Sequence, residues 1–245
     1  MSIKRFSTIL SLLASLQLSH AASGDLEWTI TPTGSIASLR AIVAVTDQDI
    51  WASGDNGTVL HSTNGGGHWS RMQGLPNDLD FRGLQTLDGH TVLLMSAGPG
   101  EKSRIYRSTD TGAHWSLVHR NQVKDAFFDN IAFFDFRRGL VVGDPVGGAF
   151  FLLETYDAGA TWKRLDGPSA KLDEGVFAAS NSSLTVSRSG RAWFGTGGLL
   201  GGRVYGSSDS GASLGDILGA ALSKRAAKEG DEEPKGKKGK AKDEE

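Results

Sequence analysis

One short pattern occurs four times in this chain, and it limits the possible folds more than any other feature. Its copies are Ser62–Trp69, Ser108–Trp115, Thr155–Trp162 and the shorter Ser208–Leu214. The first three copies end in tryptophan at positions 69, 115 and 162, which gives a spacing of 46 and 47 residues. Self-similarity at a constant period indicates an architecture built from repeated supersecondary units.

Three short runs rich in β-branched and aromatic residues precede each copy, and a fourth follows it. In the first unit these runs begin near Leu39, Ile50, Thr58 and Trp69. Gly, Asp and Asn separate the runs, which is typical of strands joined by tight turns. A period of about 45 residues with four strands per unit matches a propeller blade. The sequence therefore predicts an all-β propeller of about four four-stranded blades, with the ring either closed or incomplete.

The repeated pattern has a structural explanation. Its third residue has a side-chain oxygen that can accept backbone N–H groups across a turn, and its fifth is a glycine suited to positive φ. Its eighth is a large apolar ring that can be buried. We interpret these positions as scaffold: Asn64, Gly66, Trp69, Asp110, Gly112, Trp115, Asp157, Gly159, Trp162, Asp209 and Gly211.

The two ends of the chain differ from the repeats. Lys4 and Arg5 precede a short apolar run, and small residues follow it, so residues 1–21 are predicted to be a signal peptide. Residues 22–213 contain the blades, and residues 214–245 are predicted to form a short helix and a disordered charged tail. We therefore expect an exported protein, periplasmic or extracellular, with no integral membrane span after cleavage. The chain has no cysteine, which excludes disulfides and thiolate metal sites.

The repeats resemble those of Asp-box (BNR-repeat) propellers, and more specifically of the photosystem II stability/assembly factor-like group. The resemblance covers about Leu26 to Gly211 and includes the stretches Trp51–Val59, Gly98–Tyr106 and Gly143–Gly148. It implies a non-enzymatic protein-binding or assembly scaffold whose partner is another protein, such as a membrane-protein subunit. Members of this group have larger rings, so four blades and a fourth repeat without its tryptophan suggest a C-terminally truncated product that forms an open arc. A genuine four-blade ring and closure by oligomerisation are the alternatives.

A binding surface is expected on the loops that join the strands, where functional residues tend to lie. The formal net charge of −2 does not favour nucleic acid as the ligand. We predict no cofactor and no metal. The candidate surface consists of four arginines, which could form a basic patch, and two acids: Arg82, Arg104, Arg137, Arg138, Asp144 and Glu174.

Two alternatives remain open. The first is an exported glycoside hydrolase of the sialidase/BNR class, which would need a tyrosine nucleophile with a carboxylate, an acid/base aspartate and three arginines. Two loop carboxylates could also converge at one mouth of the ring, from among Glu101, Asp125, Asp129, Asp144 and Glu174. The second is a carbohydrate-binding propeller, which would expose Trp51 or Trp193 in a groove. We expect both tryptophans to be buried on their strands.

Overall fold

The computed structural model describes residues 26–178 and 182–208. The predicted signal peptide, the predicted helix and tail, and the last repeat from Asp209 onward, with Gly211, lie outside these residues. The chain divides into two units after Thr31. In the first unit, residues 26–31 form no helix or strand, and the side chains of Leu26, Trp28 and Ile30 are exposed. No helix in the described parts of the chain is long and apolar enough to cross a membrane.

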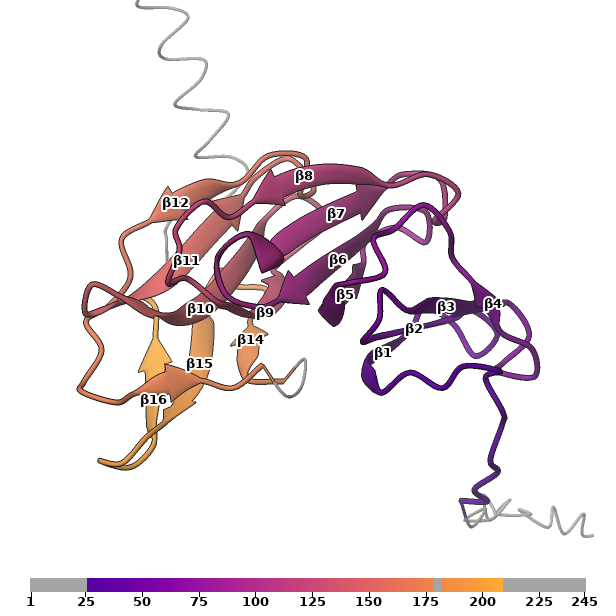
Figure 1. Cartoon of the computed structure of the whole chain (residues 1–245), viewed down its shortest axis with the longest axis horizontal. Coiled ribbons are helices and arrows are strands. Elements are labelled where there is room, and N and C mark those ends of the chain that lie inside the picture. Colours follow the sequence, from indigo (N-terminus) through magenta and orange to yellow (C-terminus); the bar gives the residue numbers. More distant parts are fainter. Residues whose placement is uncertain (1–25, 179–181, 209–245) are drawn as a thin grey trace, which may run out of the picture. The chain divides into compact units, whose positions relative to one another are not determined.

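In the described part of the second unit, sixteen strands form four antiparallel sheets that follow one another along the chain (Figure 1). The first blade contains β1 (Leu39–Ala44), β2 (Ile50–Gly54), β3 (Val59–Ser62) and β4 (Ser70–Arg71). The second contains β5 (Asp80–Thr86), β6 (Val92–Ala97), β7 (Arg104–Ser108) and β8 (Ser116–Arg120), with the short 3-10 helix η1 (Gly100–Lys102) before β7. The third contains β9 (Phe128–Phe133), β10 (Gly139–Val146), β11 (Ala149–Thr155) and β12 (Lys163–Leu165). The fourth contains β13 (Gly175–Val176), β14 (Leu184–Val186), β15 (Ala192–Gly197) and β16 (Arg203–Gly206).

The first three blades have one topology, in which the four strands are hydrogen-bonded in chain order. The fourth blade differs. Phe194 of β15 pairs with Leu184 of β14 and also with Tyr205 of β16, and Thr196 pairs with Val176 of β13 and with Arg203 of β16. The strands β13 and β14 therefore share one edge of β15, and β16 occupies the other. No described strand fills the outermost position that β4, β8 and β12 fill in the other blades.

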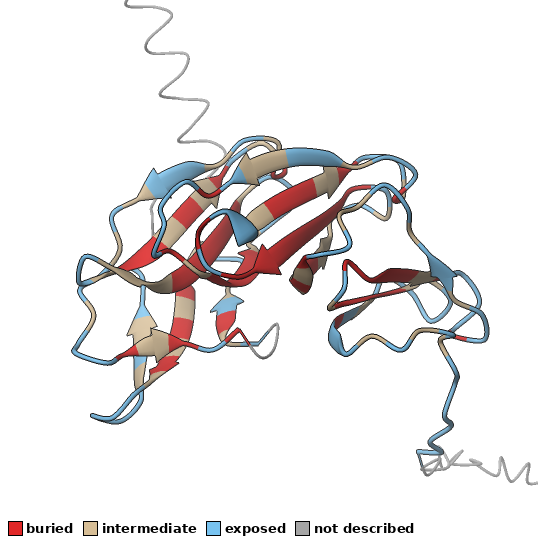
Figure 2. Ribbon diagram, in the orientation of Figure 1, coloured by how far each residue is buried: buried red, intermediate tan, exposed pale blue. Residues whose placement is uncertain are grey.

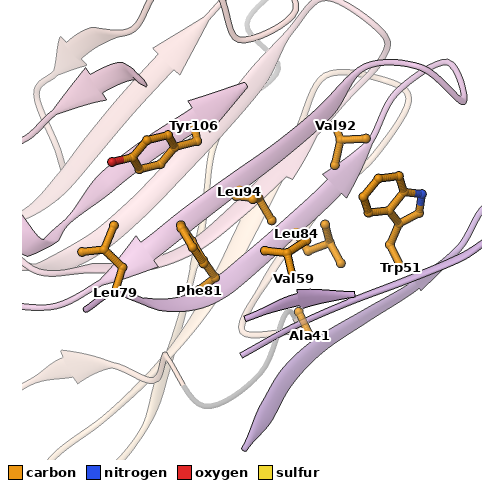
Figure 3. Packing of buried hydrophobic residues seen from close by; sticks show 9 residues of the cluster. All are labelled: Ala41, Trp51, Val59, Leu79, Phe81, Leu84, Val92, Leu94 and Tyr106. Carbon is orange, nitrogen blue, oxygen red and sulfur yellow. The ribbon is translucent and has the colours of Figure 1, made fainter. Parts of the chain in front are cut away.

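The core lies between successive blades. Figure 3 shows the first junction, where Trp51 and Val59 of the first blade meet Phe81, Leu84 and Leu94 of the second. A second cluster joins the second and third blades, and a third cluster joins the third and fourth. Buried residues accordingly concentrate on the strands (Figure 2). The burial of apolar area between sheets is the main favourable term that holds such a fold together. The predicted all-β propeller of about four blades is confirmed.

The repeated pattern forms the same turn in each of the first three blades. The hydroxyl of its first residue accepts the N–H of the glycine at position five, at 2.9 Å for Ser62 and Ser108 and 3.1 Å for Thr155. The third residue then accepts the N–H of position seven, at 2.8–2.9 Å. The glycines have φ of 86°, 81° and 78°, a region that glycine enters without strain. These side chains thus fix the link between the third and fourth strands.

Candidate functional site: an acidic pocket beside the fourth blade

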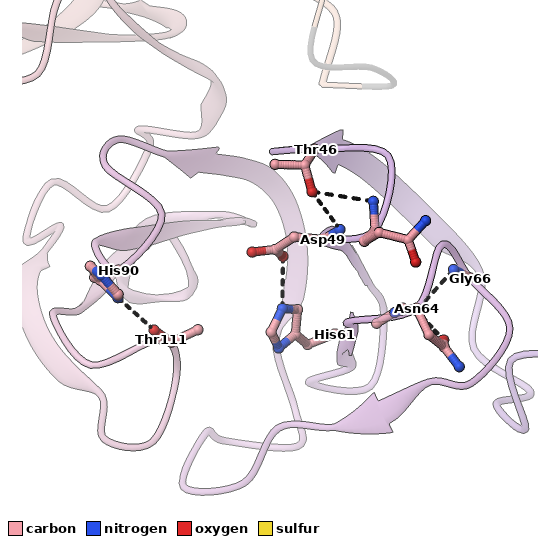
Figure 4. A network of polar contacts seen from close by, with 9 residues as sticks. Thr46, Asp49, His61, Asn64, Gly66, His90 and Thr111 are labelled. Atoms are coloured by element: carbon pink, nitrogen blue, oxygen red, sulfur yellow. Dashed lines mark hydrogen bonds and ion pairs between the residues drawn. The ribbon is translucent and has the colours of Figure 1, made fainter.

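The two ends of the blades carry different structures. At one end, each repeated turn rests on the hairpin between the first two strands of its own blade. The N–H of Gly65 donates to the Gln48 carbonyl, Thr111 to His90, and Ala158 to Arg137. Figure 4 shows this region for the first two blades, with the His90–Thr111 and His61–Asp49 contacts. Because these turns use their polar groups on one another, we place the candidate site at the other end.

Arg137 and Arg138 lie at the turn end, in the β9–β10 hairpin. The Arg137 guanidinium donates to the Tyr156 carbonyl at 3.3 Å. The Arg138 guanidinium lies over the rings of Phe134 and Tyr156, at 4.3 and 5.6 Å from their centroids. Both arginines therefore contact the repeated turn of their own blade.

Arg82 and Arg104 lie at the opposite end of the second blade. Arg82 binds the Asp80 carboxylate at 2.8 Å, and Arg40 approaches the same carboxylate at 3.5 Å. Arg104 donates to the Glu101 carbonyl at 2.7 Å. Each pair of arginines contacts groups within its own part of the fold. Because the two pairs lie at opposite ends of the blades, the four arginines do not form one basic patch.

The predicted acids Asp144 and Glu174 do come together. They line an open pocket of about 690 Å³ between the third and fourth blades. Asp125 and Asp173 add two further carboxylates to its lining, and Lys171 adds one cation. Four carboxylates against one ammonium group make this pocket acidic. In the described residues, no group of three histidine or acidic side chains is arranged to hold a metal ion.

Glu174 is the most strongly bound of these acids. Its carboxylate accepts the Tyr205 hydroxyl at 2.8 Å and the Lys171 N–H at 2.9 Å, together with the Thr196 hydroxyl, and Arg203 forms an ion pair at 3.2 Å. Burial alone would raise the pKa of Glu174, but these donors outweigh it and lower the pKa to about 2. Glu174 is therefore a fixed anion that links the pocket loop to β15 and β16.

Asp129 and Asp144 form a second acidic element. Asp129 is only 3% exposed, and one of its carboxylate oxygens has no hydrogen-bond partner. Burial, and then the neighbouring Asp144 carboxylate, raise the pKa of Asp129 to about 9. Burial also raises the pKa of Asp144, whose carboxylate accepts the Val176 N–H at 3.0 Å. Asp129 is thus neutral at pH 7, and it neighbours Asp144 of the pocket lining.

The site also bears on the two alternatives. Of the three tyrosines, only Tyr205 contacts a pocket carboxylate, and burial followed by the Glu174 hydrogen bond raises the pKa of its hydroxyl. Trp51 is fully buried between the first two blades, as expected. The expectation for Trp193 is wrong, because this ring is only partly buried beneath the Arg191 guanidinium, 5.0 Å from its centroid. Its strand has no described blade on that side.

Two charged residues of the pocket, Lys171 and Asp173, were not identified from the sequence, and neither was Arg203, which pairs with Glu174. The first two lie in a tight turn before β13, where Asp173 adopts a φ of 57°. The polar run Lys171–Gly175 is a turn signal that marks this loop. Arg203 could not be found in this way, because its contact with Glu174 joins positions 29 residues apart in the sequence.

Comparisons with known proteins support the fold alone. No protein-family model matches the chain, and no curated protein matches it. A structure of YCF48 bound to D1 peptide is similar with a TM-score of 0.51 at 16% identity, over 70% of this chain and 55% of that one. YCF48 from Cyanidioschyzon merolae gives 0.50 at 16% identity, over 74% of this chain and 60% of that one. The GH74 enzyme from Niastella koreensis gives 0.53 at 16% identity, over 71% of this chain and 30% of that one.

The chain therefore spans a little over half the length of the YCF48 chains and under a third of the GH74 chain. These neighbours include a peptide-bound protein and an enzyme, so they do not decide between binding and catalysis. At 16% identity they show that the chain has the β-propeller fold.

Proposed function

We propose that this chain is an exported, protein-binding propeller of the Asp-box, photosystem II assembly factor-like type, and that it holds an extended polypeptide segment of a partner at the acidic pocket. The observation that carries the proposal is the character of that pocket, which is open and lined by Asp125, Asp144, Asp173, Glu174 and Lys171. Small-molecule sites are usually concave and mostly apolar, and they bury most of the ligand. An open, charged depression suits a polypeptide better.

The charges of the pocket favour a basic segment. Glu174 is already neutralised by Arg203, whereas Asp125 and Asp173 are exposed and have no ion pair among those found in the described residues. A lysine or arginine of the partner would supply the missing cation, and charge complementarity of this kind mainly raises the association rate and the specificity. The similar YCF48 structure has a peptide bound, which supports a polypeptide as the class of ligand.

Glycoside hydrolysis is the second candidate, and the Asp129–Asp144 pair is the observation that favours it. Such enzymes use two carboxyl groups, one as an acid with a raised pKa. Asp129 has the raised pKa but is buried, so a sugar could not reach it without a movement of the loops. Binding is therefore the better supported function. An Asp144→Asn variant tests this second candidate, because it would abolish hydrolysis of a xyloglucan or sialoside substrate.

A cross-linking experiment tests the binding proposal. A photoreactive residue replaces Leu172, which is 77% exposed in the pocket, and in a matched variant it replaces Phe136, which is 48% exposed at the turn end. Both proteins are irradiated with periplasmic and membrane extracts of the source cells. We expect a discrete protein adduct at position 172 only. Equal labelling at both positions, or no protein adduct together with measurable hydrolysis of a glycan, would overturn the proposal.

Removal of the negative charges of the pocket tests whether they are needed for binding. Asp125→Asn with Asp173→Asn should reduce the yield of the adduct at position 172 about tenfold, the size expected for the loss of about 1.4 kcal/mol of binding free energy. Asparagine tolerates the positive φ of Asp173, which limits the effect on the turn. The control is Asp47→Asn, an exposed acid in the β1–β2 hairpin of the first blade. An adduct that persists in the double variant would show that the acidic charge is not the recognition element.

A further inference from the structure

The first and fourth blades lie at the two ends of the row of described blades, and the strand register shows which of their outward positions stay exposed. On the first strand of each blade, Ile42 pairs with Ala52, Leu84 with Leu94, Ile131 with Val141 and Leu184 with Phe194. These equivalent residues point toward the preceding blade. Leu84 and Ile131 are fully buried and Leu184 is 3% exposed, but Ile42 of the first blade is 69% exposed, although Ala52 and Leu60 in the same cross-strand row are buried.

The third strands show the converse. Val59, Ile105, Leu152 and Val204 occupy one register position and point toward the following blade. Val59 and Ile105 are fully buried and Leu152 packs against the third cluster, but Val204 of the fourth blade is 75% exposed. The exposed positions Ile42 and Val204 thus correspond to the two opposite sides of the junction that the described blades form three times.

The repeated turn gives an independent view of the same junction. A Cβ on Gly112 would lie 2.9 Å from the Trp51 ring of the preceding blade, and a Cβ on Gly159 would lie 2.2 Å from Leu93. A Cβ on Gly66 of the first blade would have only atoms of Trp69, from the same blade, within 4 Å. No side chain of another described blade therefore occupies this position. Trp193 of the fourth blade, in the register of Trp51 and Leu93, is the partly exposed side chain that would fit it.

We propose that two copies of this chain associate head to tail, with the fourth blade of each copy packed on the first blade of the other. The structure favours a second copy because the exposed positions Ile42 and Val204 are equivalent to residues that face each other at the junctions of this same chain. In the described residues of one chain, no strand of the first blade has an extensive contact with the fourth blade. Such a heterologous contact closes into a ring when the rotation fits, which here gives eight blades and two equal junctions.

Mutation of the two faces tests the proposal. The mature chain should have twice its monomer mass in light scattering at micromolar concentration. Ile42→Asp and Val204→Asp should each place a buried charge in both junctions and lower the dimer affinity at least 100-fold. Phe136→Asp, an exposed apolar residue outside both faces, is the control and should leave the mass unchanged.

Mixing the two variants gives the sharpest result. In a mixed dimer, the intact fourth blade of the Ile42→Asp copy meets the intact first blade of the Val204→Asp copy, so one junction is fully restored. We therefore expect the mixture to form dimers at concentrations where each variant alone is monomeric. A monomeric wild-type chain, or a mixture that stays monomeric while both variants give native circular dichroism spectra, would overturn the proposal.

Thiol cross-linking covers the case in which an aspartate variant fails to fold. The chain has no cysteine, so Ile42→Cys and Val204→Cys introduce single thiols. A short bis-maleimide should yield covalent dimers when the two variants are mixed, and few when either is alone. Efficient cross-linking within a single Ile42→Cys/Val204→Cys chain would instead show that the ring closes on itself.

Discussion

The third and fourth blades have similar strands but differ in what covers them. In β10 of the third blade, the five residues Gly139–Gly143 are all buried, because neighbouring blades cover both faces. In β15 of the fourth blade, buried and partly buried residues alternate over Ala192–Gly197, because among the described blades the third alone covers it. The burial of a residue in this fold is therefore decided by the adjacent blades and not by the strand in which it lies.

The two blades also shift the pKa of a buried carboxyl group in opposite directions. Asp129 of the third blade has one carboxylate oxygen with no hydrogen bond, and its pKa is raised to about 9. Glu174 of the fourth blade receives hydrogen bonds from β15, β16 and its own loop, and its pKa is lowered to about 2. The fourth blade, which is less completely covered, thus contains the acid with more hydrogen bonds, Glu174. Polar contacts stabilise the side of this blade that faces the pocket.

The largest effect is expected from the junction between these two blades. The Phe150 ring is fully buried and contacts the rings of Phe194 and Tyr205 with centroids 5.0 Å apart. Phe150→Ala should lower the free energy of unfolding by about 4 kcal/mol, since it removes the ring and leaves a cavity. Urea denaturation followed by circular dichroism measures this change. A loss below about 1 kcal/mol would show that the fourth blade contributes little to cooperative stability.

Asp129→Asn is expected to stabilise the protein by about 2 kcal/mol at pH 7, because the folded wild type must retain a proton there. The folded pKa of Asp129 lies near 9 and the ordinary value is 3.8, so unfolding releases a proton between these limits. Wild-type stability should therefore fall as the pH rises from about 4 to about 9, by up to about 1.4 kcal/mol per pH unit. The free energy of unfolding, measured by denaturation at several pH values across this range, should change less with pH for the variant.

The control for this pH dependence is Glu174→Gln, which should act with the opposite sign. The folded pKa of Glu174 is lowered from 4.5 to about 2, so its contribution is present above pH 4.5 and is lost as the pH falls toward 2. The variant should melt several degrees lower at pH 7 and lose the acid-dependent decrease between these values. If both variants shift stability in the same direction at pH 7, the contrast between the two carboxyl groups is wrong.

The fold was predictable because the repeated turn is a local structure. Ser108, Asp110 and Gly112 lie within five residues and bond to one another, so their spacing indicates the turn directly. The pocket was only partly predictable. Asp144 and Glu174 were identified as candidates, but the contact of Asp144 with Val176 joins two blades and leaves no pattern in the sequence. The exposure of Trp193 and the separation of the arginines likewise depend on how blades are placed.

A smaller effect on stability is expected from the repeated turn of the third blade, between β11 and β12. Asp157 accepts the Thr161 N–H at 2.9 Å and the Thr155 hydroxyl at 2.8 Å. Asp157→Ala should cost about 1.5 kcal/mol, because the N–H of position 161 loses a charge-assisted bond near the surface. Asp157→Asn is the matched control and should recover most of the loss, since asparagine occupies this position in the first blade. A null effect of Asp157→Ala in thermal denaturation would mean that the Thr155 hydroxyl alone fixes the turn.

The smallest effect on stability is expected at Val204. It tests directly whether the adjacent blades decide the burial of a residue. Val204→Thr adds a hydroxyl where the side chain is 75% exposed, so at concentrations too low for association it should change stability by less than about 0.5 kcal/mol. The same substitution at the equivalent but fully buried Val59 should cost about 2 kcal/mol, because the hydroxyl would lose its water without gaining a partner. Equal losses at the two positions in dilute urea denaturation would show that the fourth blade is already covered within one chain. A difference that shrinks as protein concentration rises would instead show that association buries Val204.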